Sequence, residues 1–148
     1  MSGIILWGPK TIAWFDVWSI DHFVTGVNLY FFVLMLHARF RPGEDPAGNR
    51  FSIWGWVLAL CFAWEALEHY LEVGLAGAWL MSWLQGVEFS VNRLITDPLM
   101  IGLGAWTAQR YGKLNRPAKI FSTAWIVVHL CFFPDSMYLQ RFLPIIRL

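Results

Sequence analysis

Four long apolar stretches, separated by short polar connectors, make up most of this chain. They cover residues 19–38, 53–71, 94–109 and 120–137, and the third extends back toward residue 86. A hydrocarbon layer about 30 Å thick is crossed by roughly 20 mostly apolar residues in a helix. The pattern therefore predicts an all-α fold: a polytopic membrane helical bundle of about four transmembrane helices, forming a single transmembrane domain over residues 1–148.

Shorter segments flank these stretches. Residues 7–18 carry aromatic side chains on both sides of Asp16, which predicts a short amphipathic segment lying along the membrane interface. Residues 72–83 are interrupted by Gly74 and Gly77, so a span, a re-entrant segment and a surface helix all stay open for them. Residues 41–48 are rich in proline and glycine and predict a turn-rich connector.

Composition supports a membrane protein and excludes other classes. The chain is 57% hydrophobic and 14% charged, which is far less charged than an ordinary soluble domain. A net charge of +1 without a basic stripe gives no reason to expect a nucleic-acid partner. Cys61 and Cys131 lie inside apolar runs, so neither a disulfide framework nor a zinc knuckle is predicted. Residues 1–15 lack the basic start and apolar run of a secretory signal, so we expect no cleaved leader.

The basic residues predict the orientation of the bundle. Short loops rich in Lys and Arg stay in the cytoplasm. The connectors after the first and third stretches carry seven basic residues, against four elsewhere. These seven are Arg39, Arg41, Arg50, Arg110, Lys113, Arg116 and Lys119. We therefore expect a bacterial inner-membrane protein with both termini on the non-cytoplasmic side.

Acidic residues gather at the opposite ends of the spans. Eight of the ten acids, all but Glu44 and Asp45, fall near stretch ends that an up-and-down path places on the non-cytoplasmic side. Residues three or four apart share a helix face, as Glu65 does with Glu68 and His69. Unpaired charges at membrane depth are costly and usually mark a functional site. The sequence therefore predicts an acid and histidine site at this end.

Carboxylates and imidazoles that converge from facing helices are typical ligands of a divalent metal ion. The predicted metal ligands are His22, Glu65, His69 and Glu88. Glu68 and Asp97 are the predicted catalytic residues, with Glu72 as another possible base. The predicted supporting residues behind the ligands are Asp21, Asn28, Asn92 and Arg93. Such a metal can activate water against an ester or phosphoester, so the predicted enzyme is a metal-dependent hydrolase acting on an envelope lipid.

Several of these residues also have purely structural interpretations. Asp97 before Pro98 is typical of a helix N-cap, and Ser19 can cap the first span in the same way. Arg93 and Asp97 are spaced for an ion pair within one helix. Glu72 and Asp135 can lie in headgroup water. A hydrogen-bonded interfacial or core histidine is the expectation for both His37 and His129.

Three short motifs resemble those of the VanZ and YjdF type of small bacterial membrane protein. They are Asp21-His22-Phe23-x-x-Gly26, Trp64-Glu65-x-x-Glu68-His69, and Asp97 followed by Gly102-x-Gly104-Ala105. The resemblance covers the first three spans, about two thirds of the chain. Glu88 and Asn92 stand where that group usually has further acids. The resemblance implies a role in the cell envelope and at most a lipid or envelope substrate.

Other function classes fit the same pattern. A non-catalytic subunit or lipid-binding partner in a larger membrane complex would use the polar end for docking. A haem or quinone protein is another possibility; haem needs axial histidines at matching depth, and His22 and His69 are the candidates. A proton-coupled transporter of this size would have to be a homo-oligomer.

Overall fold

The structure is a computed structural model that describes residues 3–84, 86–131 and 144–148, without the side chains of residues 129 and 130. The described part is mostly helical, which confirms the all-α prediction. The longer helices are α1 (Val17–Phe40), α2 (Arg50–Glu72), α4 (Asp97–Arg110) and α5 (Asn115–Cys131). The short elements are β1 (Ile5–Trp7), α3 (Ala78–Leu84), the π-helical turn η1 (Asn92–Thr96), the 3₁₀ turn η2 (Gly112–Leu114) and β2 (Ile146–Arg147).

The two candidate spans, α1 and α2, match the first two predicted stretches. Both are long and apolar enough to cross a membrane. Within the described residues, α4 has 14 residues and α5 has 17, so neither meets the same length there, and four crossings are not established by the helices alone. The last part of the fourth predicted stretch, residues 132–137, lies outside the described residues, as does Asp135.

Helix α1 starts at a reciprocal cap. The Asp16 carboxylate accepts hydrogen bonds from the backbone N–H of Trp18 (2.8 Å) and of Ser19 (3.1 Å), while Ser19 Oγ accepts from the Asp16 N–H at 3.1 Å. This arrangement satisfies amide groups that have no partner within the helix. The prediction that Ser19 is the cap is therefore wrong, because Asp16 takes that place and Ser19 is the third helical residue.

Two glycines let α1 and α4 pack backbone to backbone. A Cβ atom on Gly26 would lie 2.1 Å from the Ile101 carbonyl oxygen, and one on Gly104 would lie 1.9 Å from the Phe23 carbonyl oxygen. No larger residue fits at either position without separating the helices. The apolar core, which includes Val57 and Ala105, continues along this contact.

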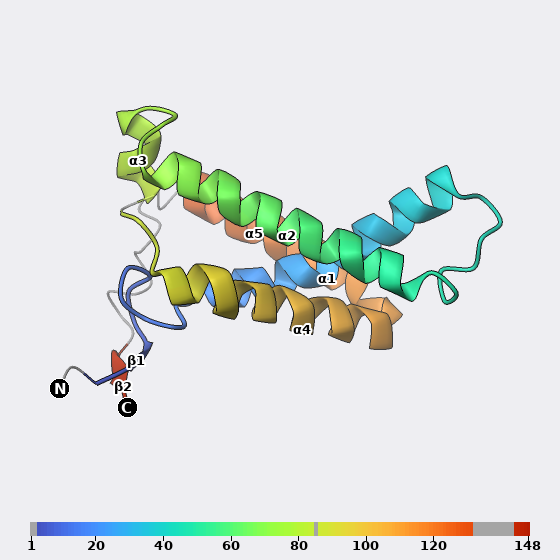
Figure 1. Cartoon of the computed structure of the whole chain (residues 1–148), viewed down its shortest axis with the longest axis horizontal. Coiled ribbons are helices and arrows are strands. Elements are labelled where there is room, and N and C mark those ends of the chain that lie inside the picture. The colour runs from blue at the N-terminus through green and yellow to red at the C-terminus, as the bar shows by residue number, and fades with distance from the viewer. Residues whose placement is uncertain (1–2, 85, 132–143) are drawn as a thin grey trace.

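One end of the bundle holds both termini of the described chain together with α3, and the α1–α2 connector lies at the other end (Figure 1). β1 and β2 pair antiparallel at the first end, with Ile5 opposite Arg147. The segment between β1 and α1 turns inward, since Lys10 is 2% exposed and Asp16 is fully buried. The predicted interfacial segment over residues 7–18 is thus instead a short strand and a loop that inserts into the bundle.

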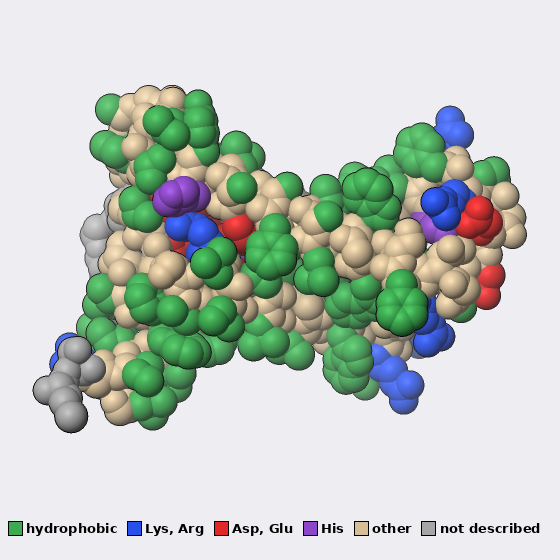
Figure 2. Space-filling model, in the orientation of Figure 1, with side chains coloured by type: hydrophobic (Ala, Val, Ile, Leu, Met, Phe, Trp, Pro, Cys, Tyr) green, Lys and Arg blue, Asp and Glu red, His purple; other side chains and the backbone are tan. Residues whose placement is uncertain are grey.

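After α2, the chain reverses through Gly74 (φ 83°) and Gly77 (φ 111°), which adopt the left-handed conformation that favours glycine. Helix α3 follows with seven residues, none of them buried. Seven residues extend only about 10 Å, so α3 is a surface helix rather than a span. Large hydrophobic side chains cover much of the molecular surface between the two ends, and most charged groups lie near those ends (Figure 2).

Candidate metal centre

The polar interior lies where α1, α2, η1, α4 and the N-terminal loop meet. Its members, here called the buried cluster, are ionisable or amide side chains that come from all of these elements. Glu68 keeps 16% of its side chain exposed, and the other members are at most 8% exposed. The buried cluster consists of Lys10, Asp16, His22, Glu65, Glu68, Glu72, Glu88, Asn92, Arg93 and Asp97.

One half of the buried cluster is a compensated ion-pair network around Glu72. Lys10 Nζ and Arg93 Nη2 both donate hydrogen bonds to the Glu72 carboxylate, and the Glu88 N–H donates to it at 3.0 Å. Glu72 is 1% exposed. The interpretation that Glu72 lies in headgroup water is therefore wrong: two cations bury it at the end of α2.

Arg93 joins this network to its neighbours. Its guanidinium lies 3.6 Å from Glu88 Oε2 and 4.0 Å from Glu65 Oε2. Among the described residues, these acids and Glu72 are the ion-pair partners of Arg93, so the predicted pair with Asp97 is wrong. The η1 turn accounts for the change, because a π-helical turn has a wider repeat than an α-helix and shifts the relative directions of the two side chains.

The other half of the buried cluster centres on His22, whose contacts define its tautomer. His22 Nδ1 lies 2.9 Å from the Trp18 carbonyl oxygen, which can only accept, so Nδ1 carries the proton. His22 Nε2 lies 3.4 Å from Glu65 Oε1. In a neutral ring, a lone pair on Nε2 would face a carboxylate oxygen. This approach is favourable only with a proton or a metal ion between the two atoms.

Several carboxylate oxygens beside His22 have no hydrogen-bond donor among the described residues. Both oxygens of Glu65 and of Asp97, and Oε2 of Glu88, are buried without such a partner. A buried acceptor left unsatisfied costs about 1–3 kcal/mol, and more when it is charged. Asp97 therefore does not act as the predicted helix cap: it lies inside the first turn of α4, and its carboxylate bonds no backbone amide of the described chain.

Two groups of side chains could each hold a metal ion. His22, Glu65 and Glu68 form one, and Glu65, Glu88 and Asp97 form the other. In each group the potential ligand atoms lie within 4.8 Å of one another. The structure thus brings together His22, Glu65, Glu68, Glu88 and Asp97, all of which the sequence analysis proposed as ligands or catalytic residues.

Other predicted site residues lie elsewhere. His69 is exposed, and its Nδ1 faces Arg93 Nη1 at 3.0 Å, so it does not join either group. Asn28 donates to Ser122 Oγ on α5 at 2.7 Å, away from the metal groups. Asn92 does support the site, because its amide donates to Glu88 Oε1 at 3.0 Å. The side chain of His129 lies outside the described residues.

Burial alters the titration of the acids that lie outside the long helices. Burial raises the pKa of Asp16, although its hydrogen bonds from Ser19 and Trp18 and the nearby His22 act in the opposite direction. The pKa of Glu88 is also raised, first by burial and then by the negative charges of Asp97 and Glu68. A protonated Glu88 therefore removes part of the negative charge excess at the site.

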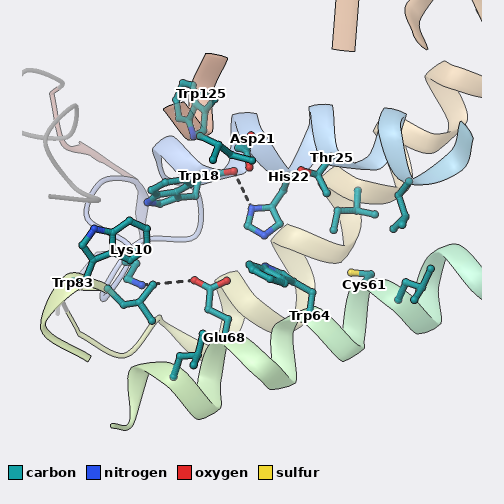
Figure 3. Close-up of a pocket in the computed structure, with 16 residues that line it drawn as sticks. Lys10, Trp18, Asp21, His22, Thr25, Cys61, Trp64, Glu68, Trp83 and Trp125 are labelled. Carbon is teal, nitrogen blue, oxygen red and sulfur yellow. Dashed lines mark hydrogen bonds and ion pairs between the residues drawn. The ribbon is translucent and has the colours of Figure 1, made fainter. Parts of the chain in front are cut away.

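A pocket of about 580 Å³ opens beside the first metal group. Figure 3 shows Lys10, His22 and Glu68 at one part of this pocket, with Trp64 and Cys61 further along α2. Lys10 Nζ lies 3.8 Å from Glu68 Oε1 there. Asp21 also lines the pocket, next to His22 along the chain. Molecules that enter the pocket can therefore reach His22 and Glu68.

Sequence reasoning missed Lys10 and Asp16 as members of this site. Asp16-x-x-Ser19 before an apolar run was a readable helix-start signal. Lys10 had a weaker signal, namely a single cation inside an aromatic and apolar segment.

No family model, curated protein or solved structure matches this chain. The resemblance to VanZ and YjdF-type proteins accordingly stays a prediction.

Proposed function

We propose that this protein is a four-span integral membrane protein with a metal-dependent hydrolase site at the non-cytoplasmic end of its bundle. Two observations support four crossings. Helical residues run without a break from Ser90 through η1 to the end of α4. At about 1.5 Å per residue, this run is about 31 Å long. Large apolar side chains on α4 and α5, including Trp106 and Ile126, are more than half exposed, as expected for contact with lipid.

The basic connectors support the proposed orientation. The connector between α1 and α2 and the end of α4 both lie at the end of the bundle opposite the termini (Figure 1). Seven of the eleven basic residues belong to these two connecting regions. By the positive-inside rule, that end faces the cytoplasm. The buried cluster then faces the bacterial periplasm or cell surface.

We place one divalent metal ion between His22, Glu65 and Glu68. The single observation that carries this proposal is the approach of His22 Nε2 to Glu65 Oε1 at 3.4 Å, with both Glu65 oxygens buried and unbonded among the described residues. The hydrogen bond from His22 Nδ1 to the Trp18 carbonyl is the contact that commonly orients a metal-binding imidazole. Three protein ligands leave a further position open, as in catalytic zinc sites.

The second group of acids fits a proton better than a second metal. The Arg93 guanidinium already lies beside Glu65 Oε2 and Glu88 Oε2, and its charge opposes another cation there. Burial raises the pKa of Glu88, which favours its neutral form. Asp97 Oδ1 lies 3.5 Å from His22 Nδ1, and Asp97 does not line the pocket.

A divalent metal ion supplies a nucleophilic water at neutral pH and polarises a carbonyl or phosphoryl oxygen. With a metal held there, the Glu68 oxygen that does not bind it would accept the proton of the attacking water. The water oxygen bonds to the acyl carbon or phosphorus, the bond to the alkoxy oxygen breaks, and Glu68 returns the proton to that oxygen. Glu68 fits this role better than Asp97, because Glu68 lines the pocket and Asp97 is fully buried.

Metal content measures the proposal directly. The wild-type protein, purified in detergent and exchanged into chelator-free buffer, is compared with Glu65→Gln by elemental mass spectrometry. We expect a stoichiometric metal in the wild type and its loss in Glu65→Gln, which keeps the side-chain shape but removes the charge. His69→Ala is the matched control on the same helix and should retain the metal, because His69 lies outside the ligand group.

A metal-free wild type would contradict the metal site, and so would equal metal content in Glu65→Gln. The protein would then better fit a non-catalytic subunit or lipid-binding partner of a membrane complex. Hydrolysis is tested separately, with ester and phosphoester substrates in mixed micelles before and after chelation. Product release that survives removal of the metal would contradict a metal-dependent reaction.

A further inference from the structure

The pocket beside His22 has a polar part and an apolar part arranged along the helices. Sixteen residues line it, and Lys10, Asp21, His22 and Glu68 are its acidic, basic and imidazole members. All four lie near the end of the bundle that holds the termini. Leu29 on α1 and Leu60 on α2 line the pocket on the side toward the connector. From His22 and Glu68 toward the connector, the pocket lining is therefore mostly apolar.

Residue spacing gives the depth of the apolar part. Leu29 follows His22 by seven residues, and Leu60 precedes Glu68 by eight on an antiparallel helix. At about 1.5 Å per residue, these separations correspond to about 10–12 Å. Both helices give the same depth because they run side by side through the bundle. The apolar part thus extends about two helical turns below the polar groups.

Aromatic rings line the pocket around its polar groups. Trp18 and Trp125 contact each other edge to face, with ring centroids 5.9 Å apart, and Trp64 faces them from α2. Figure 3 shows these rings around the space next to His22 and Glu68. The pocket volume of about 580 Å³ is large enough for a small organic ligand. Pockets that enclose such ligands generally measure roughly 300–1000 Å³.

We infer that this pocket binds the alkyl chain of a lipid ester or phosphoester, with the chain between Leu29 and Leu60 and the head oxygen beside His22 and Glu68. The placement of the head rests on the proposed metal site, whereas the placement of the chain rests on the pocket alone. An extended chain advances about 1.2 Å per bond, so the apolar part holds about eight to ten carbons. Two apolar residues that line the pocket, Trp64 and Ile126, are about half exposed on the surface of the bundle, which fits a ligand that comes from a membrane.

The inference predicts a chain-length limit. Each buried methylene contributes about 0.8 kcal/mol, which corresponds to about fourfold tighter binding. Affinity should rise by about this factor per carbon until the chain reaches Leu29 and Leu60, near ten carbons, and should then level off. The probes are alkyl phosphates of six to sixteen carbons, and native mass spectrometry of the full chain in detergent measures how much of each probe stays bound.

Substitutions at the deep end should move the limit in opposite directions. Leu60→Trp fills the end of the pocket and should lower the limiting chain length, whereas Leu60→Ala should raise it. Leu67→Trp is the matched control on α2, because Leu67 is 47% exposed and does not line the pocket. An identical chain-length profile in all four proteins, or a steady increase to sixteen carbons in each, would overturn the inference.

The same experiment separates the chain pocket from the metal site. Wild type and Glu65→Gln are compared with added Mn²⁺ and with chelator. A limit near ten carbons without any metal effect supports the pocket and contradicts the metal proposal. Metal-dependent phosphate binding without a chain-length limit supports the metal proposal and contradicts the pocket. Together, a limit and a metal effect that Glu65→Gln removes would support both.

Discussion

The two ends of the bundle carry similar charged side chains in opposite surroundings. At the connector end, Arg41 and Glu44 approach to 3.4 Å with about half of each side chain exposed. At the other end, Lys10 and Glu72 pair with side-chain exposures of 2% and 0%. Water screens the first pair, so its contribution is about 0–1 kcal/mol. The second pair has lost its hydration and depends on its protein partners.

Charge balance differs as well. The buried cluster contains six acidic side chains, namely Asp16, Glu65, Glu68, Glu72, Glu88 and Asp97, and two basic side chains, Lys10 and Arg93. A buried ion pair generally stabilises a fold no better than apolar residues of the same size, and excess charge is worse. The cluster is therefore better explained by the binding of cations, whether protons or a metal, than by stability.

The two ends also differ in the surroundings of their histidines, His37 at the connector end and His22 in the buried cluster. Its ring is buried, Nε2 lies 3.9 Å from Glu44, and neither ring nitrogen has a hydrogen-bond partner among the described residues. His37 is therefore a core histidine, as predicted, but the predicted hydrogen bond is absent among the described residues. In contrast to His22, His37 has one partly exposed carboxylate nearby, which gives it no set of metal ligands within the described chain.

The largest expected effect comes from neutralising Glu72. Glu72→Gln leaves Lys10 and Arg93 buried without their shared countercharge. Breaking a buried pair in this way costs about 3–5 kcal/mol of unfolding free energy. Glu44→Gln makes the same chemical change at the exposed connector, where about 0–1 kcal/mol is expected. Unfolding in mixed micelles with increasing SDS measures both. Equal losses in the two variants would remove the distinction between the ends.

The sequence predicted the positions of the two longest helices and the end of the bundle at which the acids gather. α1 and α2 extend at most three residues beyond the predicted stretches at any end, because long apolar runs define membrane-length helices. Alternate crossing also predicted that acids from separate helices share one end, and the structure brings Glu65, Glu88 and Asp97 together. Both predictions depend only on the order and the length of the helices along the chain.

Side-chain direction was harder to predict, as Glu65, His69 and Glu72 illustrate. Residues advance about 100° around a helix, which places Glu72 about 20° from Glu65 on one side and His69 about 40° on the other. Spacing alone allowed all of them to face inward. In the structure His69 is instead exposed, with its Nδ1 beside Arg93 Nη1. Lys10 was not predictable, because its position depends on how the N-terminal loop inserts between the helices.

A smaller effect is expected from separating α1 and α4. Gly104→Ala places a methyl group against the Phe23 carbonyl. Overpacking of this kind costs about 1–3 kcal/mol. Gly102→Ala is the matched control two residues away, where nothing lies within 4 Å of the added Cβ. It should be neutral or stabilise α4 by about 0.5–1 kcal/mol. SDS titration compares the two, and a harmless Gly104→Ala would contradict the close helix contact that holds His22 near Asp97.

The smallest effect, taken over a single pH unit, is a pH dependence that belongs to the buried end. Burial and the nearby Asp97 raise the pKa of Glu88 above its ordinary value of 4.5. Between that value and the raised pKa, folded Glu88 keeps a proton that the unfolded chain has lost. Stability should therefore fall as pH rises through this window, by at most about 1.4 kcal/mol per pH unit.

Glu88→Gln isolates this contribution, because the amide cannot titrate. With chelator present, unfolding free energy measured between about pH 5 and pH 9 should fall less steeply in Glu88→Gln than in the wild type. Asp16, Glu65, Glu68 and Asp97 face Glu88 and stay intact in both proteins. Asp45→Asn in the exposed connector should leave the slope unchanged. A wild-type slope that Glu88→Gln does not alter would mean that Glu88 is ionised in the folded protein, and the cluster would then need a metal ion to balance its charge.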